Sequence, residues 1–309
     1  MSIVRILNYQ INEEYNEKTV LSFLKDKGYP DSSLTALRKR MGLILFNDIP
    51  VPITHSMHLS DGENNLTISI EETNSSLKIL PVKLDFEIVY EDDDILVINK
   101  PANMPIHPSM NNYENSLANG LAYYFKEKNL PFVFRCINRL DKDTTGLTII
   151  AKHALSAGKL SYQMQKRAIK REYTAIVSGI NLKKEGTIDL PIARVNDSLI
   201  TREVNVENGE TAITHYRLIE EFPTENLSLV KLRLETGRTH QIRVHMKAIG
   251  HPLIGDYLYN PTDKTMDRQA LHAGSISFVH PISDESMSFN VDMPSDMRSV
   301  LPSYKTLNT

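Results

Sequence analysis

The sequence predicts an α+β fold with a small module ahead of one larger domain. Apolar stretches with a period of two, which are typical of half-buried strands, recur along the chain, and stretches of helical periodicity lie scattered between them. This order does not fit a regular βαβ repeat and indicates a mixed sheet with helices around it. At 309 residues the chain is also too long for one small domain.

The polar run EETNSS at residues 71–76 predicts where the first module ends. We therefore expect a module over residues 1–76, a linker over 77–84, a main domain over 85–300 and a C-terminal tail over 301–309.

The module is predicted to contain two short helices followed by strands. Over residues 19–41 an apolar stripe has helical spacing, a Gly-Tyr-Pro sequence interrupts it, and Asp31 or Ser32 is placed to cap the second helix. A strand, a turn and a strand are expected over 43–51, and a further strand over 66–70. The second helix ends in three bases, so we predict that the module clamps RNA through Arg38, Lys39 and Arg40.

The main domain is predicted to mix strands and helices irregularly. Residues 94–100 form a buried strand that Pro101 stops, because proline lacks a donor and restricts the residue before it. The last helix is expected to have Thr239 as its N-cap and to stop at Gly250. The remaining predicted elements are helices over 115–128 and 153–170 and strands over 146–152, 171–179 and 227–237.

Composition and charge exclude several classes of protein. Cys136 is the single cysteine, so neither a disulfide framework nor a thiolate metal cluster is expected. There is no signal-peptide pattern at the start and no window near the ~18 apolar residues of a membrane span, so we expect a cytoplasmic protein without membrane contact. The net charge is −3, but residues 134–174 hold nine bases against three acids, which creates a local positive field.

Spacing disfavours three kinds of site. His240, His245 and His251 suggest zinc, but residues five apart on a helix point about 140° apart, and no HExxH motif is present. No metal site is therefore predicted. Residues 143–146, DTTG, interrupt the Asp-Thr-Gly of aspartic proteases, whose chemistry needs a second carboxylate, and no GxxxxGK[ST] phosphate loop occurs.

The stretch INRLDKDTTGL, residues 137–147, holds Asp141 between Arg139 and Lys142 on a loop that enters a buried strand. Loops on a rigid scaffold often carry functional side chains. The same residues also fit a surface ion pair between Asp141 and Arg139, which contributes only about 0–1 kcal/mol. Charge and spacing leave both interpretations open.

Longer motifs favour a functional acid. NRLDKDTTGL, REYTAIVSG and ETGRTHQIRVH resemble the signature of the RluA-type RNA pseudouridine synthases, which is HRLDxxTSGL, a strand with Tyr, and GRTHQIRVH. The resemblance continues through EIVYEDDDILVINKPANMPIHPS, HPLIGDYLY and ALHAGSISFVHP in the same order, and it spans roughly residues 85–298. It implies a catalytic domain with a mixed, mostly antiparallel sheet flanked by helices. The N-terminal module resembles, in divergent form, the S4-type RNA-binding domain that many members carry.

The resemblance implies isomerisation of uridine in RNA: the N1–C1′ bond breaks, uracil turns over, and C5 bonds to C1′. Nothing is added or removed, so neither cofactor nor metal is implied. Asp141 is implied as the catalytic carboxylate, and Arg243 and Arg139 would keep this buried acid ionised. Attack on C1′ and a glycal route both stay open. The implied substrate-binding residues are Tyr173 on the uracil, Leu271 as an apolar wall, Arg243, Arg139 and Arg238; the implied RNA-backbone contacts are Lys166, Arg167, Lys170 and Arg171.

Three positions depart from the family's motifs. Asn138 stands where the usual His precedes Arg-Leu-Asp, Thr145 replaces the Ser of TSG, and Asn103 replaces the Gly after Lys-Pro-Ala. Asn103 fits if its φ is positive, which Asn adopts more readily than most residues. Asn138 affects only what the family's His does for the loop, and none of the three changes touches the acid.

The implied partner is a structured RNA, and the chain is expected to be a monomer. A second RNA-binding surface gains most where two sites are engaged together, so the module favours 23S large-subunit ribosomal RNA over transfer RNA. Two alternatives stay open: a transfer-RNA pseudouridine synthase of the same family, and an RNA-binding adaptor that has kept the fold and lost the chemistry. The intact Asp141, Tyr173 and Arg243 favour the enzyme.

Overall fold

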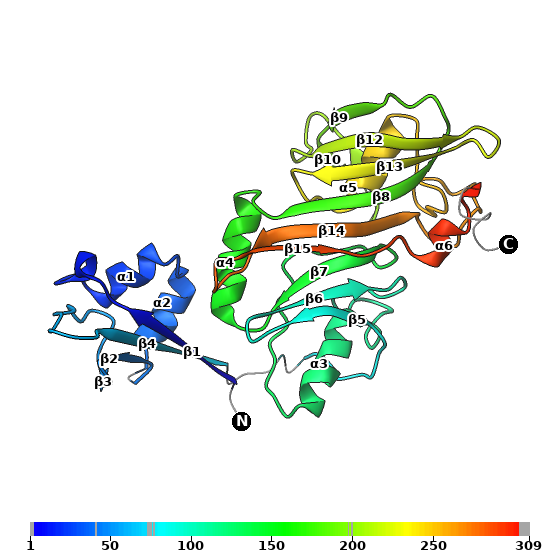
Figure 1. Ribbon diagram of the computed structural model, residues 1–309. Helices are drawn as coiled ribbons and strands as arrows, with labels where there is room; N and C mark the ends of the chain where they lie inside the picture. The colour runs from blue at the N-terminus through cyan, green and yellow to red at the C-terminus, as the bar shows by residue number, and fades with distance from the viewer. Residues whose placement is uncertain are drawn as a thin grey trace.

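A computed structural model of the chain places a small N-terminal module beside one large sheet, with helix α4 (Ala154–Gln165) between them (Figure 1). No helix in the described part of the chain is long and apolar enough to cross a membrane. The structure describes residues 3–40, 42–72, 76, 78–196, 198 and 200–302.

The N-terminal module is an antiparallel sheet with two helices against it, in the strand order β1-β4-β2-β3. Thr19 caps the first helix, because its side chain accepts a hydrogen bond from the Ser22 amide at 3.2 Å. The two predicted helices and the strands that follow them are confirmed. The elements are β1 (Ile3–Gln10), a 3-10 turn (Glu13–Tyr15), α1 (Val20–Asp26), α2 (Asp31–Arg38), β2 (Ile44–Phe46), β3 (Ile49–Pro50) and β4 (Asn65–Glu72).

Two features of the module differ from the sequence prediction. Strand β1 was not predicted; it pairs with β4 along its whole length, from Ile3 opposite Glu72 to Gln10 opposite Asn65. The N-cap of α2 is Pro30, with an extended backbone, and not Asp31 or Ser32. Proline has no amide hydrogen and a fixed φ, so it can end the preceding loop at this point without losing a donor.

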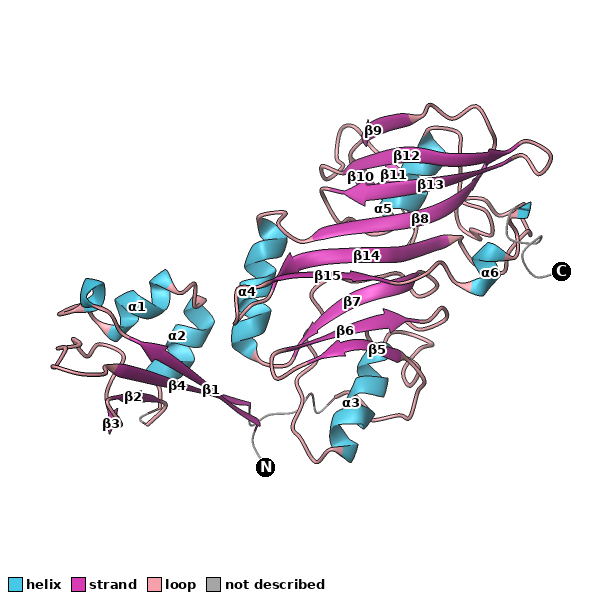
Figure 2. Cartoon of the chain, in the orientation of Figure 1, coloured by secondary structure: helices cyan, strands magenta, loops and turns pink. Residues whose placement is uncertain are grey.

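The main domain is built on a nine-stranded sheet whose order is β5-β6-β7-β14-β8-β13-β12-β9, with β15 also pairing with β14 (Figure 2). Only β7 and β14 pair in parallel; the other pairs in this sheet are antiparallel. The predicted mixed, mostly antiparallel sheet is confirmed. Its strands are β5 (Glu87–Glu91), β6 (Ile95–Lys100), β7 (Thr145–Ala151), β8 (Lys170–Ser178), β9 (Glu185–Asp189), β12 (Ile213–Phe222), β13 (Leu227–Leu234), β14 (Leu271–Val279) and β15 (Ser286–Asn290).

Helices and one small hairpin complete the main domain. Ser116 and Asn119 form a capping box at the start of α3. The helix predicted over 115–128 is therefore confirmed. The remaining elements are α3 (Leu117–Glu127), β10 (Ile192–Arg194) paired with β11 (Arg202–Val204), α5 (Gln241–Ala248) and α6 (Ser295–Arg298).

Two helix boundaries were predicted wrongly. Helix α4 ends at Gln165 and not at 170, because Arg167 adopts a left-handed backbone with φ of 55° and β8 begins at Lys170. Helix α5 begins one residue later than expected: its N-cap is His240, with φ of 58°, and not Thr239. The predicted stop at Gly250 is confirmed by its φ of 84°.

The N-terminal module and the main domain share an apolar contact and ion pairs made by two arginines. Leu155 of α4 is fully buried within the core of the module. Arg5 of β1 donates to Asp94 at 2.8 Å, and Arg135 lies 2.7 Å from Glu72. Because these contacts involve the start of both β6 and α4, the module is fixed against the same sheet that carries the site described below.

The predicted linker packs on the main domain where the structure describes it. Ser76 donates its amide to the carbonyl of Phe132 at 3.0 Å, and its hydroxyl accepts from the amide of Phe134 at 3.1 Å. The side-chain amide of Asn119 donates to the carbonyl of Leu80 at 2.8 Å. Residues 78–84 therefore lie alongside α3.

Candidate active site

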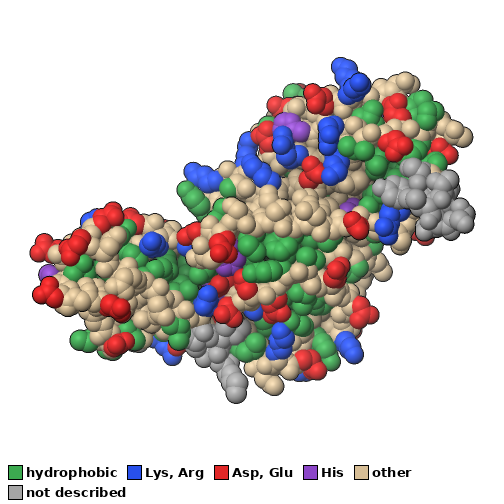
Figure 3. Space-filling model, viewed as in Figure 1, with side chains coloured by type: hydrophobic (Ala, Val, Ile, Leu, Met, Phe, Trp, Pro, Cys, Tyr) green, Lys and Arg blue, Asp and Glu red, His purple; other side chains and the backbone are tan. Residues whose placement is uncertain are grey.

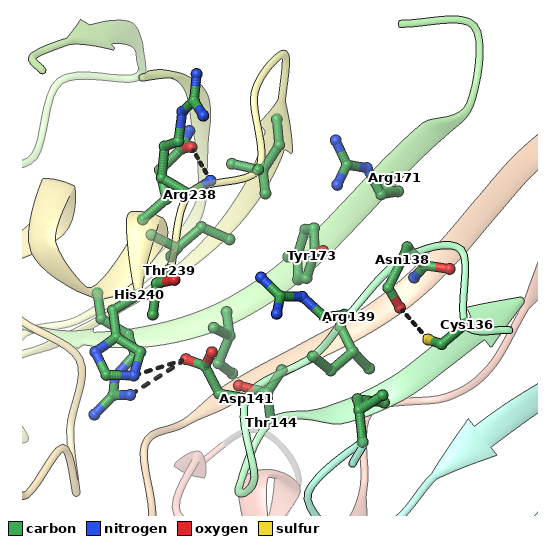
Figure 4. Close-up of a pocket in the computed structure, with 18 of the residues that line it drawn as sticks. Cys136, Asn138, Arg139, Asp141, Thr144, Arg171, Tyr173, Arg238, Thr239 and His240 are labelled. Carbon is green, nitrogen blue, oxygen red and sulfur yellow. Dashed lines mark hydrogen bonds and ion pairs between the residues drawn. The ribbon is translucent and has the colours of Figure 1, made fainter. Parts of the chain in front are cut away.

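A cleft of about 560 Å³ opens in the main domain. Its walls include the loop over 136–144 that enters β7, one face of β8 with the start of β14, and the loop that leads into α5 (Figure 4). The segment over 105–109 also lines it. Asp141, Arg139, Tyr173, Arg171, Arg238, Arg243 and Leu271 all line this cleft.

Asp141 lines the cleft with its carboxylate accessible. Its side chain is 26% exposed, so the acid is not the buried group that the sequence suggested. One carboxylate oxygen accepts a hydrogen bond from Arg243 at 3.2 Å. The loop turns back directly after it, since the amide of Thr144 donates to the carbonyl of Asp141 at 3.1 Å.

Arg243 connects Asp141 to a second, fully buried carboxylate. Its Nε and one terminal nitrogen donate to the two oxygens of Asp256, both at 2.7 Å. Burial by itself would lower the pKa of Arg243, but the hydrogen bonds and charge of Asp256 and the charge of Asp141 raise it above its ordinary value. The guanidinium is therefore a permanent cation, and its position is fixed by a bidentate pair before it reaches Asp141.

Two side chains anchor the loop that carries Asp141. Leu140 is buried in the same apolar cluster as Tyr173 and Leu271. Asn138, which replaces the family's His, is buried, and its side-chain amide donates to the carbonyl of Leu147 at 3.0 Å and accepts from the amide of Ile149 at 2.9 Å. The loop is thus tied to β7, so Asn138 has a structural role here.

Close packing and hydrogen bonds also fix the end of the Asp141 loop that leads into β7. Gly146 has φ of 113°, and a Cβ there would lie 2.3 Å from the carbonyl oxygen of Ala273, so only glycine lets β7 run beside β14. Asn103 has the expected positive φ, 57°, and its amide donates to Asp143 at 3.2 Å. Buried Lys100 donates to the carbonyls of Pro101, Met104 and Lys142 at 2.7–2.9 Å.

Tyr173 and Leu271 form the apolar side of the cleft. Tyr173 projects from β8 and Leu271 begins the neighbouring strand β14; each is 4% exposed. Burial raises the pKa of Tyr173, and the positive charge of Arg171 opposes that shift. A flat ring beside an accessible carboxylate offers a stacking surface for a planar group.

Comparisons with known proteins agree with this geometry. The sequence model of the RNA pseudouridylate synthase family matches residues 94–248. The RNA pseudouridine synthase YhcT of Bacillus subtilis (strain 168) is 40% identical over 252 residues, which are 82% of each chain. The chain belongs to the RNA pseudouridylate synthase family.

Further relatives place the synthase within the RluA type. The ribosomal large subunit pseudouridine synthase D of Haemophilus influenzae is 38% identical over 298 residues, 90% of this chain and 88% of that protein. Among solved structures, human RNA pseudouridylate synthase domain containing 1 has a TM-score of 0.58 and 28% identity, over 71% of this chain and 86% of that chain. The predicted family, fold class and enzyme class are therefore confirmed: the chain is an RNA pseudouridine synthase.

The arginines predicted near the acid differ in position. Arg139 lines the cleft and is exposed, and no ion pair joins it to Asp141 among the described residues. The alternative of a surface pair between these two residues is therefore not supported. Arg238 lies at the rim, where it pairs with Glu210 and donates to the carbonyl of Thr211 at 3.0 Å.

The predicted RNA-backbone contacts do not share one surface. Arg171 lies in the cleft, whereas Lys170, its neighbour on β8, points to the opposite face of the sheet. Figure 3 shows several Lys and Arg side chains over the upper part of the sheet on the face turned to the viewer, with Asp and Glu side chains among them. Arg167 is paired with Glu235 at 2.6 Å, and Lys166 is the C-cap of α4. Arg38, Lys39 and Arg40 are exposed on the module, with Arg40 paired to Glu71.

Sequence reasoning missed two residues of the site. Asp256 lies in HPLIGDYLY, a motif that was recognised without a role for its acid. His240 lies 3.9 Å from Asp141 and shares a 2.9 Å hydrogen bond with the hydroxyl of Tyr259. Burial lowers the pKa of His240, and the charge of Arg243 adds to this shift, although the charge of Asp141 opposes it. This histidine is therefore neutral near pH 7 and does not act as a cation for Asp141.

Histidines considered for metal binding are engaged elsewhere. His245 contacts Thr214 and the carbonyl of Leu190, each at 2.9 Å, and His251 lies in the loop after α5, as expected. A separate group of possible ligands consists of Asp92, Asp94 and His280. The two oxygens of Asp94 already accept from Arg5, and His153 lies 2.8 Å from one of them, so this carboxylate already has partners within the chain.

Proposed function

We propose that the synthase converts specific uridines of large-subunit ribosomal RNA into pseudouridine, with Asp141 as the catalytic carboxylate. One observation carries the catalytic part: Asp141 is the acid of the cleft that is both accessible and hydrogen-bonded to a buried arginine, at 3.2 Å. A carboxylate held this way is accessible and is kept in one orientation by a charge-assisted hydrogen bond. That is the state required of a group that acts on C1′ of a uridine.

The hydrogen bond from Arg243 also gives the two carboxylate oxygens of Asp141 different roles. Arg243 occupies one oxygen of Asp141, which leaves the other free to face the sugar. As the N1–C1′ bond breaks, C1′ becomes electron-poor, and the free oxygen either bonds to it or stabilises it electrostatically. Tyr173 holds the detached ring by stacking, and C5 then bonds to C1′. The proton lost from C5 and the proton gained by N1 balance the reaction.

The proposed RNA substrate is supported by similarity to named relatives and by the N-terminal module. Several relatives at 35–42% identity are named ribosomal large subunit pseudouridine synthase D. The divergent S4-like module over residues 1–76, joined by the linker over 77–84 to a catalytic domain over 85–300, would add a second RNA contact through Arg38 and Lys39. A second contact favours a large RNA because both surfaces can bind one molecule.

Carbodiimide mapping of pseudouridines in total RNA from a strain that lacks the gene tests this proposal. We expect at least one site to disappear from large-subunit ribosomal RNA. Complementation with the wild type should restore it, and complementation with Asp141→Asn should not. If pseudouridine sites disappeared only from transfer RNA, the substrate would be transfer RNA and the proposed reaction would be unchanged. Restoration of the site by Asp141→Asn would contradict the catalytic role of Asp141.

A further inference from the structure

Arg171 is a buried cation in the cleft that the chain does not neutralise. It is 8% exposed, and its Nε atom has no hydrogen-bond partner. Among the described residues no carboxylate pairs with it, in contrast to Arg243, Arg167 and Arg238. Burying an unpaired charge destabilises a fold, so such a group is expected where an incoming molecule supplies the partner.

The space around the guanidinium of Arg171 is kept open by a glycine. A Cβ on Gly237 would lie 3.2 Å from a terminal nitrogen of Arg171, which is closer than ordinary van der Waals contact. Gly237 does not have a positive φ, so its backbone does not require glycine. The missing side chain instead leaves room beside Arg171, on the side that opens into the cleft.

Arg171 and Asp141 lie at opposite ends of the surface that Tyr173 presents (Figure 4). Arg171 and Tyr173 are two residues apart on β8, so they share one face at a spacing of roughly 6.6–6.8 Å. A uracil stacked on Tyr173, with N1 toward Asp141, directs its opposite edge toward Arg171. The atom on that edge is the carbonyl oxygen on C4.

The rotation of the ring retains a carbonyl at this position. Turning uracil over about its N3–C6 axis exchanges N1 with C5 and exchanges the carbonyl on C2 with the carbonyl on C4. The edge opposite C1′ therefore presents O4 before the turn and O2 after it. A fixed donor at that edge can bind both orientations of the ring.

We propose that the guanidinium of Arg171 donates to this carbonyl and takes up the negative charge of the detached uracil. This role rests on the proposed function. When the N1–C1′ bond breaks, its electron pair stays on the ring, and the charge spreads from N1 to the carbonyl oxygens. C5 then uses a ring electron pair to bond to C1′, C5 loses its proton, and N1 gains one. Arg171 contacts the reacting ring directly and is in that sense a catalytic residue, distinct from the phosphate contacts on the surface.

The test combines Arg171→Met with 4-thiouridine at the target position of the RNA, because sulfur is a weaker acceptor than oxygen. With saturating RNA, single-turnover rates should fall about 10²–10³-fold for Arg171→Met, as for loss of a donor to a developing oxyanion. Arg171→Lys, which keeps the charge, should recover part of this rate. RNA affinity by filter binding should change little. The thio substitution should slow the wild type and have no further effect on Arg171→Met.

Other outcomes would overturn the assignment. Weaker RNA binding with unchanged turnover at saturation would make Arg171 an ordinary phosphate contact. Equal slowing of wild type and Arg171→Met by the thio substitution would show that the two groups do not meet. If Arg171→Met does not fold, Gly237→Ala provides the second variant, since its methyl group would lie 3.2 Å from a terminal nitrogen of Arg171 and shift the guanidinium slightly. Its rate should fall without loss of affinity. Absence of turnover by the wild type itself would contradict the proposed function and the role of Arg171 with it, whereas the outcomes above concern Arg171 alone.

Discussion

Arg243 is held by both oxygens of the buried Asp256 at 2.7 Å, and only its remaining terminal nitrogen reaches Asp141, at 3.2 Å. The arginine is therefore part of the core as well as part of the site. Asp256 is fully buried and also accepts the backbone amides of Leu258 and Tyr259. Any change at Arg243 has to be judged on stability and on activity separately.

Arg243→Met should lose both activity and stability. The substitution leaves the Asp256 carboxylate buried without a cation, and breaking such a pair typically costs about 3–5 kcal/mol. We expect chemical denaturation to show a loss of that size. Arg243→Met combined with Asp256→Asn should regain most of the stability, because the buried charge is gone, and should stay inactive. Recovery of turnover by the double variant would contradict the role of Arg243 beside Asp141.

Asn138→Ala should misplace Asp141 without touching it. The substitution removes the partners of the Leu147 carbonyl and the Ile149 amide, and each buried unsatisfied group costs about 1–3 kcal/mol. We expect a lower melting temperature and a lower turnover at saturating RNA, with RNA affinity unchanged. Thr144→Ser is a matched control on the same loop, since its hydroxyl stays. Full turnover in Asn138→Ala would mean that the ties to β7 do not position the acid.

Lys100 should make stability depend on pH above neutrality. Burial lowers its pKa to about 7 in the folded protein, although Asp143 and Asp141 oppose the shift, against 10.5 in the unfolded chain. Between these values the unfolded chain binds more protons, so the free energy of unfolding contributed by this group rises with pH and is lost as pH falls toward 7. Urea unfolding from pH 7 to 9 should show this rise in the wild type and not in Lys100→Met. Parallel pH profiles for the two proteins would contradict it.

Arg38 and Lys39 should contribute to RNA binding through charge. Both are exposed on the module and no carboxylate pairs with them among the described residues, whereas Arg40 pairs with Glu71. Replacing either residue by alanine should reduce the slope of log affinity against log salt by about 0.9 for duplex RNA or about 0.7 for a single strand. Arg40→Ala is the matched control, and its slope should change less. Identical slopes for all the variants would remove the module from the RNA interface.

The periodicity of apolar residues predicted those helices and strands that have one buried face and one exposed face. The helix of α3 and the strand of β13 are of this kind, and the positive φ at Asn103 followed from the residue type. Strand β1 was missed because Ile6 is 51% exposed, so apolar residues on both faces hide its alternation, and its partner β4 lies some sixty residues away in the chain.

In the cleft, the sequence predicted the roles of only those residues to which a recognised motif gives a role. The position of Asp141 in its loop and the pairing with Arg243 followed from motifs, but the burial of Arg243 against Asp256 did not. The left-handed N-cap at His240 accompanies a hydrogen bond with Tyr259, which lies in a later loop. The group over 166–171 looked uniform in charge, and only the alternation of β8 separates Arg171 from Lys170.

The most direct test of the catalytic role of Asp141 is tritium release from large-subunit ribosomal RNA that carries 5-³H-uridine and was made in cells lacking the gene. Release reports the loss of hydrogen from C5 as the new bond to C1′ forms. We expect the wild type to release tritium in proportion to one or a few sites per RNA, and Asp141→Asn to bind the RNA with similar affinity and release none. Release by Asp141→Asn at the wild-type rate would contradict the account, and RNA binding by the wild type without any release would favour an adaptor.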